Sequence, residues 1–201
     1  MKPDSSVVDK TIGAGRPRDR RIDESILRAT AELLVSMGYS NLTMSAVAER
    51  AGTTKTALYR RWSNKAELVH ETVFPATPGS GLNPPHADIA DDVRGMIRAA
   101  CDVFSMPVLR AALPGLVADV AADTELNARV NKRFEGLFAA VRARLEEAIA
   151  RGEVRGYADA DRLIEIIGGT TMMRLLLHPD QELDDAWVDQ MTNIVVHGVV
   201  K

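Results

Sequence analysis

Two short helical patterns that meet at a glycine, between Thr43 and Leu68, constrain the fold of this chain more than any other feature. Thr43 is a good N-cap because its hydroxyl can accept a hydrogen bond from an otherwise unpaired backbone amide, and apolar residues follow it at helical spacing. Gly52 then ends the first helix, since glycine readily adopts the left-handed backbone conformation of a tight turn. A second helix follows through Trp62, with Leu58 and Trp62 as its inward anchors. The pattern predicts a helix-turn-helix.

The polar side chains of the second helix should face outward, where they could meet DNA. Hydroxyl groups can hydrogen-bond to phosphate, and Lys or Arg can neutralise phosphate or bind guanine. An ordinary solvated surface is the alternative for a short basic helix. DNA is favoured by Asn64, which caps a further helix beginning at Lys65, because the helix dipole disfavours a cation there unless a phosphate lies nearby. The candidate DNA contacts from this stretch are Thr54, Lys55, Thr56, Tyr59, Arg60, Arg61 and Lys65.

A longer amphipathic helix precedes this motif. Gly38 supplies its C-cap, Asp23 lies in its first turn where the helix dipole favours an acid, and Tyr39 and Leu42 can close over a small three-helix core. Its apolar stripe consists of Ile22, Ile26, Ala29, Leu33 and Met37. We therefore expect a DNA-binding domain over residues 22–74.

The run from Ile22 to Val73 resembles the N-terminal domain of the TetR (tetracycline repressor) family of transcriptional regulators. The resemblance rests on Gly38-Tyr39, Leu42-Thr43, Val47-Ala48, Ala51-Gly52, Leu58-Tyr59, Trp62, Asn64-Lys65 and Leu68. It implies that Thr43, Ser45, Thr54, Tyr59 and Lys65 touch the sugar-phosphate backbone and that Lys55, Thr56 and Arg60 approach bases. The chain departs from the family pattern in having Ala57 after Thr56, and Arg61 where many members carry His. Both departures bear on which bases are recognised.

Residues 1–21 lack a periodic apolar pattern and mix Ser, Gly, Pro and charge, so we expect a flexible basic arm. Arg16 and Arg18 could enter a narrow minor groove beside the major-groove site, with a solvated tail as the alternative. Residues 1–74 hold 12 Lys and Arg against 9 Asp and Glu, whereas the remainder holds 13 against 19. A basic end and an acidic body suit a protein that meets phosphate at one end only.

Pro and Gly cluster in residues 75–87, which predicts a linker to a second domain over residues 88–201. No segment of this second domain alternates like a strand, whereas apolar residues recur at helical spacing. The predicted helices are 88–104, 108–121, 126–151, 161–177 and 184–199. The expected fold class is therefore all-α, with about nine helices in total and the helix-turn-helix domain at the N-terminus.

The predicted helix 161–177 is apolar almost all round, so it should be buried on more than one side. It is too short and too closely flanked by charge for a membrane span, so we expect no membrane association. Pairing this helix and the last one with their copies would give a four-helix homodimer interface, as the TetR resemblance also implies. The expected interface residues are Ile167, Gly168, Gly169, Leu176, Trp187, Met191, Ile194 and Val195.

Through residues 86–201 the resemblance weakens to helix order and length. It implies a C-terminal pocket for a small-molecule effector, whose occupation moves the DNA-binding heads. Adaptable Met and flat aromatic side chains suit a mainly apolar ligand, with ordinary core packing as the alternative for each residue. The candidate pocket residues are Met96, Phe104, Leu113, Leu116, Phe134, Phe138, Met172 and Met173.

The sequence holds little sign of catalytic or metal chemistry. Its four histidines are scattered without a partner at ligand spacing, and it has neither a phosphate-binding glycine loop nor a recognisable nucleophile motif. We therefore expect no catalytic residue, cofactor or metal. Cys101 is the only cysteine, which excludes an intramolecular disulfide and favours a small buried side chain over a redox switch. Cysteine usage and the lack of targeting signals indicate the cytoplasm.

Together these features predict a homodimeric transcriptional regulator that binds a palindromic double-stranded DNA operator and responds to a small molecule. A repressor is the first expectation, and an activator of the same fold is its nearest variant. An architectural DNA-binding protein without a ligand and a helical small-molecule enzyme are the alternatives from other classes.

Overall fold

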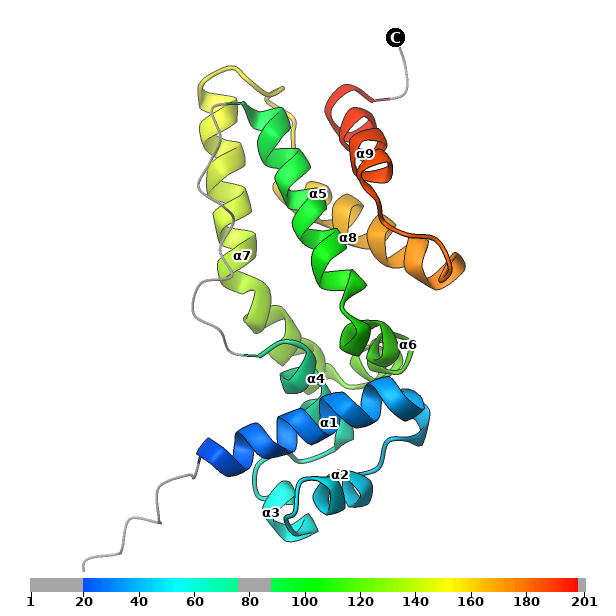
Figure 1. Cartoon of the computed structure of the whole chain (residues 1–201). Coiled ribbons are helices and arrows are strands. Elements are labelled where there is room, and N and C mark those ends of the chain that lie inside the picture. The colour runs from blue at the N-terminus through cyan, green and yellow to red at the C-terminus, as the bar shows by residue number, and fades with distance from the viewer. Residues whose placement is uncertain (1–19, 76–87, 199–201) are drawn as a thin grey trace, which may run out of the picture.

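The computed structural model describes residues 20–75 and 88–198, and within these ranges the chain forms nine α-helices and no strand (Figure 1). The all-α prediction is confirmed. The helices are α1 (Arg20–Asn41), α2 (Met44–Arg50), α3 (Lys55–Tyr59), α4 (Lys65–Val73), α5 (Ile89–Ser105), α6 (Pro107–Ala122), α7 (Thr124–Ala150), α8 (Ala160–Leu177) and α9 (Asp185–His197).

Helices α1 to α4 form a small head, and α5 to α9 form a taller body above it (Figure 1). Helix α6 lies at the base of the body against α1 and α4, while α5 and α7 extend away from the head. Helix α9 packs along α5, and α8 contacts both α5 and α7. Helix α3 lies on the side of the head farthest from the body, so the fold presents it outward.

Helix α1 differs slightly from its prediction at both ends. It begins at Arg20, so Arg20 and Arg21, expected in the flexible arm, belong to its first turn. Gly38 has a φ of 75°, which interrupts the regular helix where the sequence predicts a C-cap, although the chain turns helically again to Asn41. This interruption brings Tyr39 into the core.

One continuous apolar core joins the head to the base of the body. Buried side chains of α1, α2, α3 and α4 pack together with Leu109, Ala112 and Leu113 of α6. A second core lies farther from the head, where buried residues of α5, α8 and α9 meet: Val93, Ile97, Cys101, Ile167 and Val188. The shared first core means that α6 cannot move without disturbing the packing of the head.

Tyr39 is the most specific contact between head and body. Its ring lies so close to Gly115 of α6 that a Cβ atom added there would be 2.1 Å from the Tyr39 Cδ1 atom. The Tyr39 hydroxyl donates a hydrogen bond to Asp119, one turn farther along α6. Burial and the Asp119 carboxylate raise the pKa of Tyr39 above its ordinary value, so the hydroxyl remains a donor.

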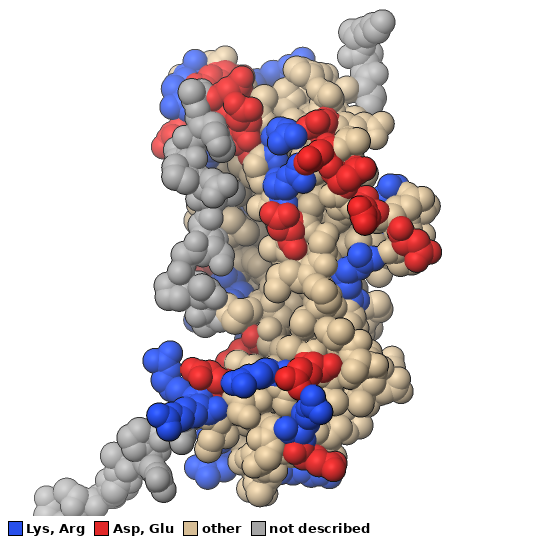
Figure 2. Space-filling view, in the orientation of Figure 1, with Lys and Arg blue, Asp and Glu red and all other residues tan. Residues whose placement is uncertain are grey.

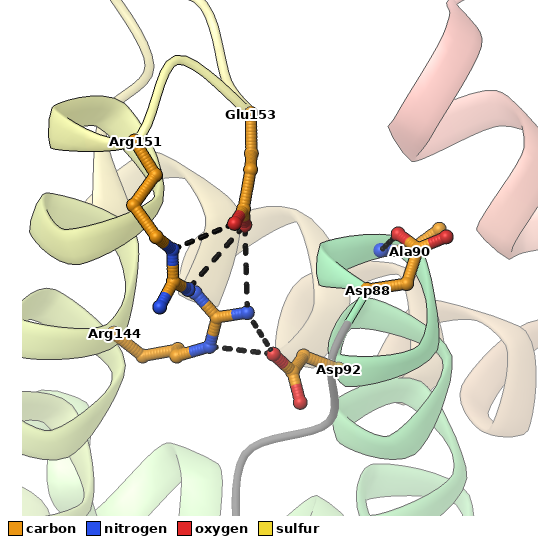
Figure 3. Close-up of polar contacts among 6 residues, drawn as sticks. All are labelled: Asp88, Ala90, Asp92, Arg144, Arg151 and Glu153. Atoms are coloured by element: carbon orange, nitrogen blue, oxygen red, sulfur yellow. Dashed lines mark hydrogen bonds and ion pairs between the residues drawn. The ribbon is translucent and has the colours of Figure 1, made fainter.

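A buried ion pair fastens α5 to α7 near the end of the body remote from the head (Figure 3). Arg144 Nη2 lies 2.6 Å from Asp92 Oδ2, and both side chains are only 6% exposed. Glu153, in the turn after α7, lies 3.7 Å from the same guanidinium and 2.6 Å from Arg151. Breaking such a pair would leave a buried charge uncompensated, so the pair fixes the spacing of the two helices.

Helix α4 reaches α7 through an aromatic cluster. The Phe74 ring packs edge-on against Phe134 with 5.1 Å between centroids, and Arg133 donates a hydrogen bond to the Phe74 carbonyl. His70 lies beside Phe74, and its Nε2 atom is buried without a hydrogen-bond partner. Burial, and then Arg133 and Arg129, lower the pKa of His70. The neutral imidazole is therefore the form that suits this junction.

No single described helix is both long and apolar enough to cross a membrane, although α5 and α6, which meet at 86°, satisfy those criteria as a pair.

The close packing of the Tyr39 ring against Gly115 can be tested by adding one methyl group at position 115. We expect Gly115→Ala to lower the free energy of unfolding by about 1–3 kcal/mol, because the new Cβ overlaps the Tyr39 ring. Gly136→Ala in α7 is the matched control, since nothing lies within 4 Å of its Cβ position, and helix propensity alone should stabilise it by up to about 1 kcal/mol. Urea unfolding at one protein concentration measures both. Equal effects would contradict a tight α1–α6 contact.

The α4–α7 junction predicts a pH dependence. Because the folded state binds the His70 proton less readily than the unfolded chain, the stabilisation is present above about pH 6.5 and is lost as the pH falls below it. We expect His70→Gln to lose less stability between about pH 7 and pH 5 than the parent. His178→Gln, at an exposed position after α8, is the control. The denaturation midpoint of His70→Gln should change less with pH than that of the parent, whereas the midpoint of His178→Gln should follow the parent. Parallel curves for His70→Gln and the parent would rule out a role of His70 in the pH dependence.

Candidate nucleic-acid interface

The helix-turn-helix forms as the sequence predicts, through a hydrogen-bonded cap at the start of each helix. Thr43 Oγ1 accepts from the Ala46 amide at 3.1 Å at the start of α2, and Thr54 Oγ1 accepts from the Ala57 amide at 3.2 Å at the start of α3. Gly52 has a φ of 65°, as expected for the tight turn between the helices. The second helix is shorter than predicted, because its regular part ends at Tyr59.

The inner side of this motif is fully packed. Leu58 and Trp62 are buried, as their spacing predicts, and join the core made by α1, α2 and α4. The Trp62 indole nitrogen donates to Glu71 of α4 at 2.7 Å. These contacts hold the inner side of α3 against the head, since at five residues the helix is too short to be stable alone.

The outer side of the motif presents hydroxyl, aromatic and basic groups to solvent. The Tyr59 side chain, four residues after Lys55 on α3, is 54% exposed. Basic side chains are visible on the head and along its lower edge, with acidic ones among them (Figure 2). Such a surface offers hydrogen-bond donors and positive charge to phosphate and base edges. The exposed residues of the predicted set are Thr43, Ser45, Thr54, Lys55, Thr56, Tyr59 and Arg60.

Lys65 has an intramolecular role that the sequence did not indicate. Its ammonium group donates to the Tyr39 carbonyl at 3.1 Å and lies 4.1 Å from the centroid of the Tyr39 ring. A cation at the start of α4 is thus stabilised by the end of α1 and by an aromatic face. Helix α4 is also capped by Asn64, whose side-chain oxygen accepts from the Glu67 amide at 2.8 Å. Contact of Lys65 with phosphate stays a prediction.

The expectation that Arg61 lies on the outer face is wrong. Its side chain is 14% exposed and pairs with Asp23 in the first turn of α1. Arg61 directly follows Arg60, the C-cap of α3, and its Nε atom donates to Asp23 of α1 instead of facing outward. Arg16 and Arg18, the expected minor-groove contacts, lie outside the described residues.

The predicted pocket residues do not converge on one site. Leu113 and Leu116 are buried in the packing of α6, and Phe104 and Met172 pack against the core shared with the head. Met96 instead packs in the second core, and Phe134 and Phe138 stack on each other at 6.0 Å. Met173 is 55% exposed on α8 and, together with Met172, lines an open groove between α8 and α9.

The predicted interface residues differ in how far they are exposed. Gly169, Leu176 and Ile194 are exposed, as an interface requires, and Gly168 is half-buried. Ile167 is wrongly placed in the prediction, because it is 7% exposed and packs against α5 within its own chain. The remaining three residues are half-buried against the same core: Trp187, Met191 and Val195.

An exposed apolar face on α8 and α9 includes three of the predicted residues and three others. It consists of Ile166, Gly169, Met173, Leu176, Leu177 and Ile194. An open groove of about 570 Å³ between α8 and α9 is lined in part by this face, through Gly169, Met173 and Leu177. Met172, Trp187 and Met191 also line it. Ile166 and Met173 lie three before and four after Gly169, so helical spacing from that glycine could have identified them.

Metal and thiol chemistry find little support in the described part of the chain. No three His, Cys, Asp or Glu side chains there gather as a metal site would require. Cys101 is buried in the second core, and burial raises the pKa of its thiol to about 11, which disfavours the reactive thiolate.

Two family models match the chain. The model described as bacterial regulatory proteins, tetR family, matches residues 26–72, which lie within the head. The model described as tetracyclin repressor-like, C-terminal domain, matches residues 83–195, more than half of the chain.

Relatives with the same organisation are also regulators. The chain is 29% identical over 188 residues to the uncharacterized HTH-type transcriptional regulator YdeS of Bacillus subtilis, covering 92% of this chain and 93% of that protein. It is 27% identical over 192 residues to the DNA-binding transcriptional repressor TetR of Mycobacteroides abscessus, covering 88% and 93%.

Solved structures share the fold. The TetR family transcription regulator SCO0332 superposes with a TM-score of 0.64 at 28% identity, over 90% of this chain and 100% of that one. The fold is shared more distantly by FadR from Bacillus subtilis in complex with stearoyl-CoA, with a TM-score of 0.62 at 16% identity over 88% and 99%.

The head geometry and these matches define a helix-turn-helix transcriptional regulator rather than an enzyme. The chain belongs to the TetR family. Regulators of this family bind DNA operators, dimerise and bind small-molecule effectors.

Proposed function

We propose that this chain is a homodimeric repressor that binds a palindromic operator and is released from it by a small, mainly apolar molecule. The observation that carries the proposal is the contrast between the two sides of α3. Its inner side is packed against the rest of the head, and its outer side exposes Lys55, Thr56 and Tyr59. A rigid helix with solvent-facing polar groups is what major-groove binding requires. The proposed place of action is the cytoplasm, where a regulator can reach DNA.

The proposed DNA contacts follow the exposed residues of the motif. Thr43, Ser45, Thr54 and Tyr59 would hydrogen-bond to phosphate, while the exposed Lys55, Thr56 and Arg60 would approach base edges. Lys65 remains a candidate phosphate contact through donors that its carbonyl contact leaves free. The expected arm contacts, Arg16 and Arg18, would add minor-groove binding.

Homodimerisation is supported by the exposed apolar face on α8 and α9. Leu177 is 65% exposed there, and Met173 and Leu176 lie beside it on the same helix. A second copy would cover both this face and the adjoining groove, whereas water would leave the apolar side chains hydrated. Two heads joined in this way would suit an operator with two-fold symmetry.

Release by an effector is supported by the way α4 ends. Phe74 packs against Phe134, and Phe134 stacks on Phe138, all half-buried. An apolar ligand that entered between these rings would displace the end of α4 and thereby tilt the head. A ligand that binds the tilted conformation more tightly than the untilted one would lower operator affinity. The loss would equal the difference between its binding free energies for the two conformations. The pocket would then centre on Phe134 and Phe138 rather than on the whole predicted set.

Selection of bound sites from random duplex DNA by the full-length protein tests this function. We expect enrichment of a palindrome with half-sites about one helical turn apart, or a multiple of it. Its position relative to a promoter would then separate a repressor from an activator. Recovery of no common sequence would overturn the proposal and favour an architectural DNA-binding protein.

Tyr59 provides a test of the phosphate contacts. We expect Tyr59→Phe to weaken binding by roughly fivefold, through loss of a hydrogen bond of about 1 kcal/mol. The loss should be equal on the selected site and on a scrambled duplex, because phosphate carries no sequence information. Tyr157→Phe, exposed in the turn between α7 and α8, is the control and should bind like the parent. A loss confined to the selected site would assign Tyr59 to base recognition instead.

Gly169 provides a test of the dimer. Nothing within the chain lies within 4 Å of its Cβ position, so Gly169→Asp should leave the protomer folded while placing a charge in the proposed interface. We expect sedimentation to show a monomer and circular dichroism to show parent helicity. Gly136→Asp, equally open on α7, should remain dimeric. A folded and dimeric Gly169→Asp variant would place the interface elsewhere.

A further inference from the structure

We infer that Arg61 is a positioning residue that holds the recognition helix α3 against α1, and that it sets the preference for the operator over other DNA without touching DNA. The inference rests on the proposed function. Arg61 is one of the positions at which the chain departs from the family pattern. The inference gives it a role in holding α3 in place of a contact with DNA.

The Arg61 guanidinium joins two helices. Its Nε atom donates to Asp23 Oδ1 in the first turn of α1, and its Nη1 atom donates to the Ala57 carbonyl of α3 at 3.0 Å. The Arg61 side chain is 14% exposed and the Asp23 side chain 27% exposed, so solvent screens this pair less than a surface pair. The rigid planar guanidinium can make both contacts at once, which a lysine ammonium could not reproduce with the same geometry.

Apolar packing alone leaves the orientation of α3 incompletely fixed. Leu58 and Trp62 anchor one side of the helix, and nondirectional packing permits a small rotation about that side. The polar link from Ala57 through Arg61 to Asp23 is directional and reaches a helix with 22 residues. A rotation of α3 would misplace Thr56 and Arg60 relative to base edges, while contacts to phosphate would adapt more easily.

A matched ion pair elsewhere in the head serves as the control. Arg50 of α2 donates through Nε and Nη2 to Glu32 of α1, at 2.8 and 2.6 Å. These side chains are 59% and 46% exposed. The two pairs thus both tie the helix-turn-helix to α1, but only the Arg61 pair is shielded and attached to α3.

Replacement of Asp23 distinguishes a positioning role of the Arg61–Asp23 pair from a purely electrostatic one, because the two predict different changes in DNA affinity. Replacing Asp23 by Asn removes a negative charge from the DNA-binding head, so electrostatics alone predicts tighter binding to every duplex. Positioning predicts weaker binding to the operator relative to other DNA, because the anchor of Arg61 is lost.

The experiment measures the affinity of the full-length dimer for a duplex with the selected site and for a scrambled duplex of the same length, at several salt concentrations. We expect Arg61→Lys and Asp23→Asn each to lower the ratio of the two affinities by roughly tenfold, with little change in salt slope. The double variant should be no worse than either single one, because both changes break the same contact. Glu32→Gln should leave the ratio unchanged. Thermal unfolding checks that each variant is folded at the binding temperature.

An unchanged ratio in Arg61→Lys would overturn the inference, as would an Asp23→Asn variant that binds both duplexes more tightly by the same factor. A salt slope reduced by about one in Arg61→Gln would instead assign Arg61 to a phosphate contact. If a single variant unfolds, the double variant Asp23→Arg with Arg61→Asp, which exchanges the two charges, is measured instead. Discrimination between the duplexes like that of the parent would support the contact, and loss of discrimination would oppose it. A parent protein that does not discriminate between the duplexes would refute the proposed function itself; discrimination by parent and variants alike refutes only the role of Arg61.

Discussion

The arrangement of head and body depends on the packing of Tyr39, near the end of α1, against α6 and α4. Its ring fills the space left by Gly115, its hydroxyl binds Asp119, and its carbonyl and ring hold the Lys65 ammonium. One residue therefore links the end of α1 to the body and to the start of α4. Because the same core is continuous across these helices, motion of α6 must be transmitted to the head rather than absorbed between them.

The head itself separates support from recognition. Helix α3 is too short to hold its own shape, so its caps, its two apolar anchors and the Arg61 link supply the order that binding needs. This support uses the inner side only, which leaves the outer side free for DNA. The body shows the same division: α8 buries Ile167 against α5 and exposes Met173 on the opposite side, as a helix between two partners would.

Much of the fold could be predicted from the sequence because the signals are local. Helical periodicity located the helices, and Gly38 and Gly52 marked turns through a backbone conformation that other residues rarely adopt. The DNA-contact candidates on α3 were identifiable for the same reason, since Leu58 and Trp62 fix which side faces inward. The ligand-pocket set did not converge, because Met and Phe at helical spacing look alike whether they pack in a core, line a pocket or lie on the surface.

The sequence by itself determined the helices, their caps, the helix-turn-helix and the family to which the chain belongs. All of these follow from residues close together along the chain, whose spacing and backbone preferences act locally. Only the tertiary structure decided that Arg61 turns toward Asp23, that Lys65 is held by Tyr39, and that Met173 rather than Ile167 faces outward on α8. The first two depend on partners 38 and 26 residues away, and the third depends on the direction in which a whole helix packs. No local pattern specifies these arrangements.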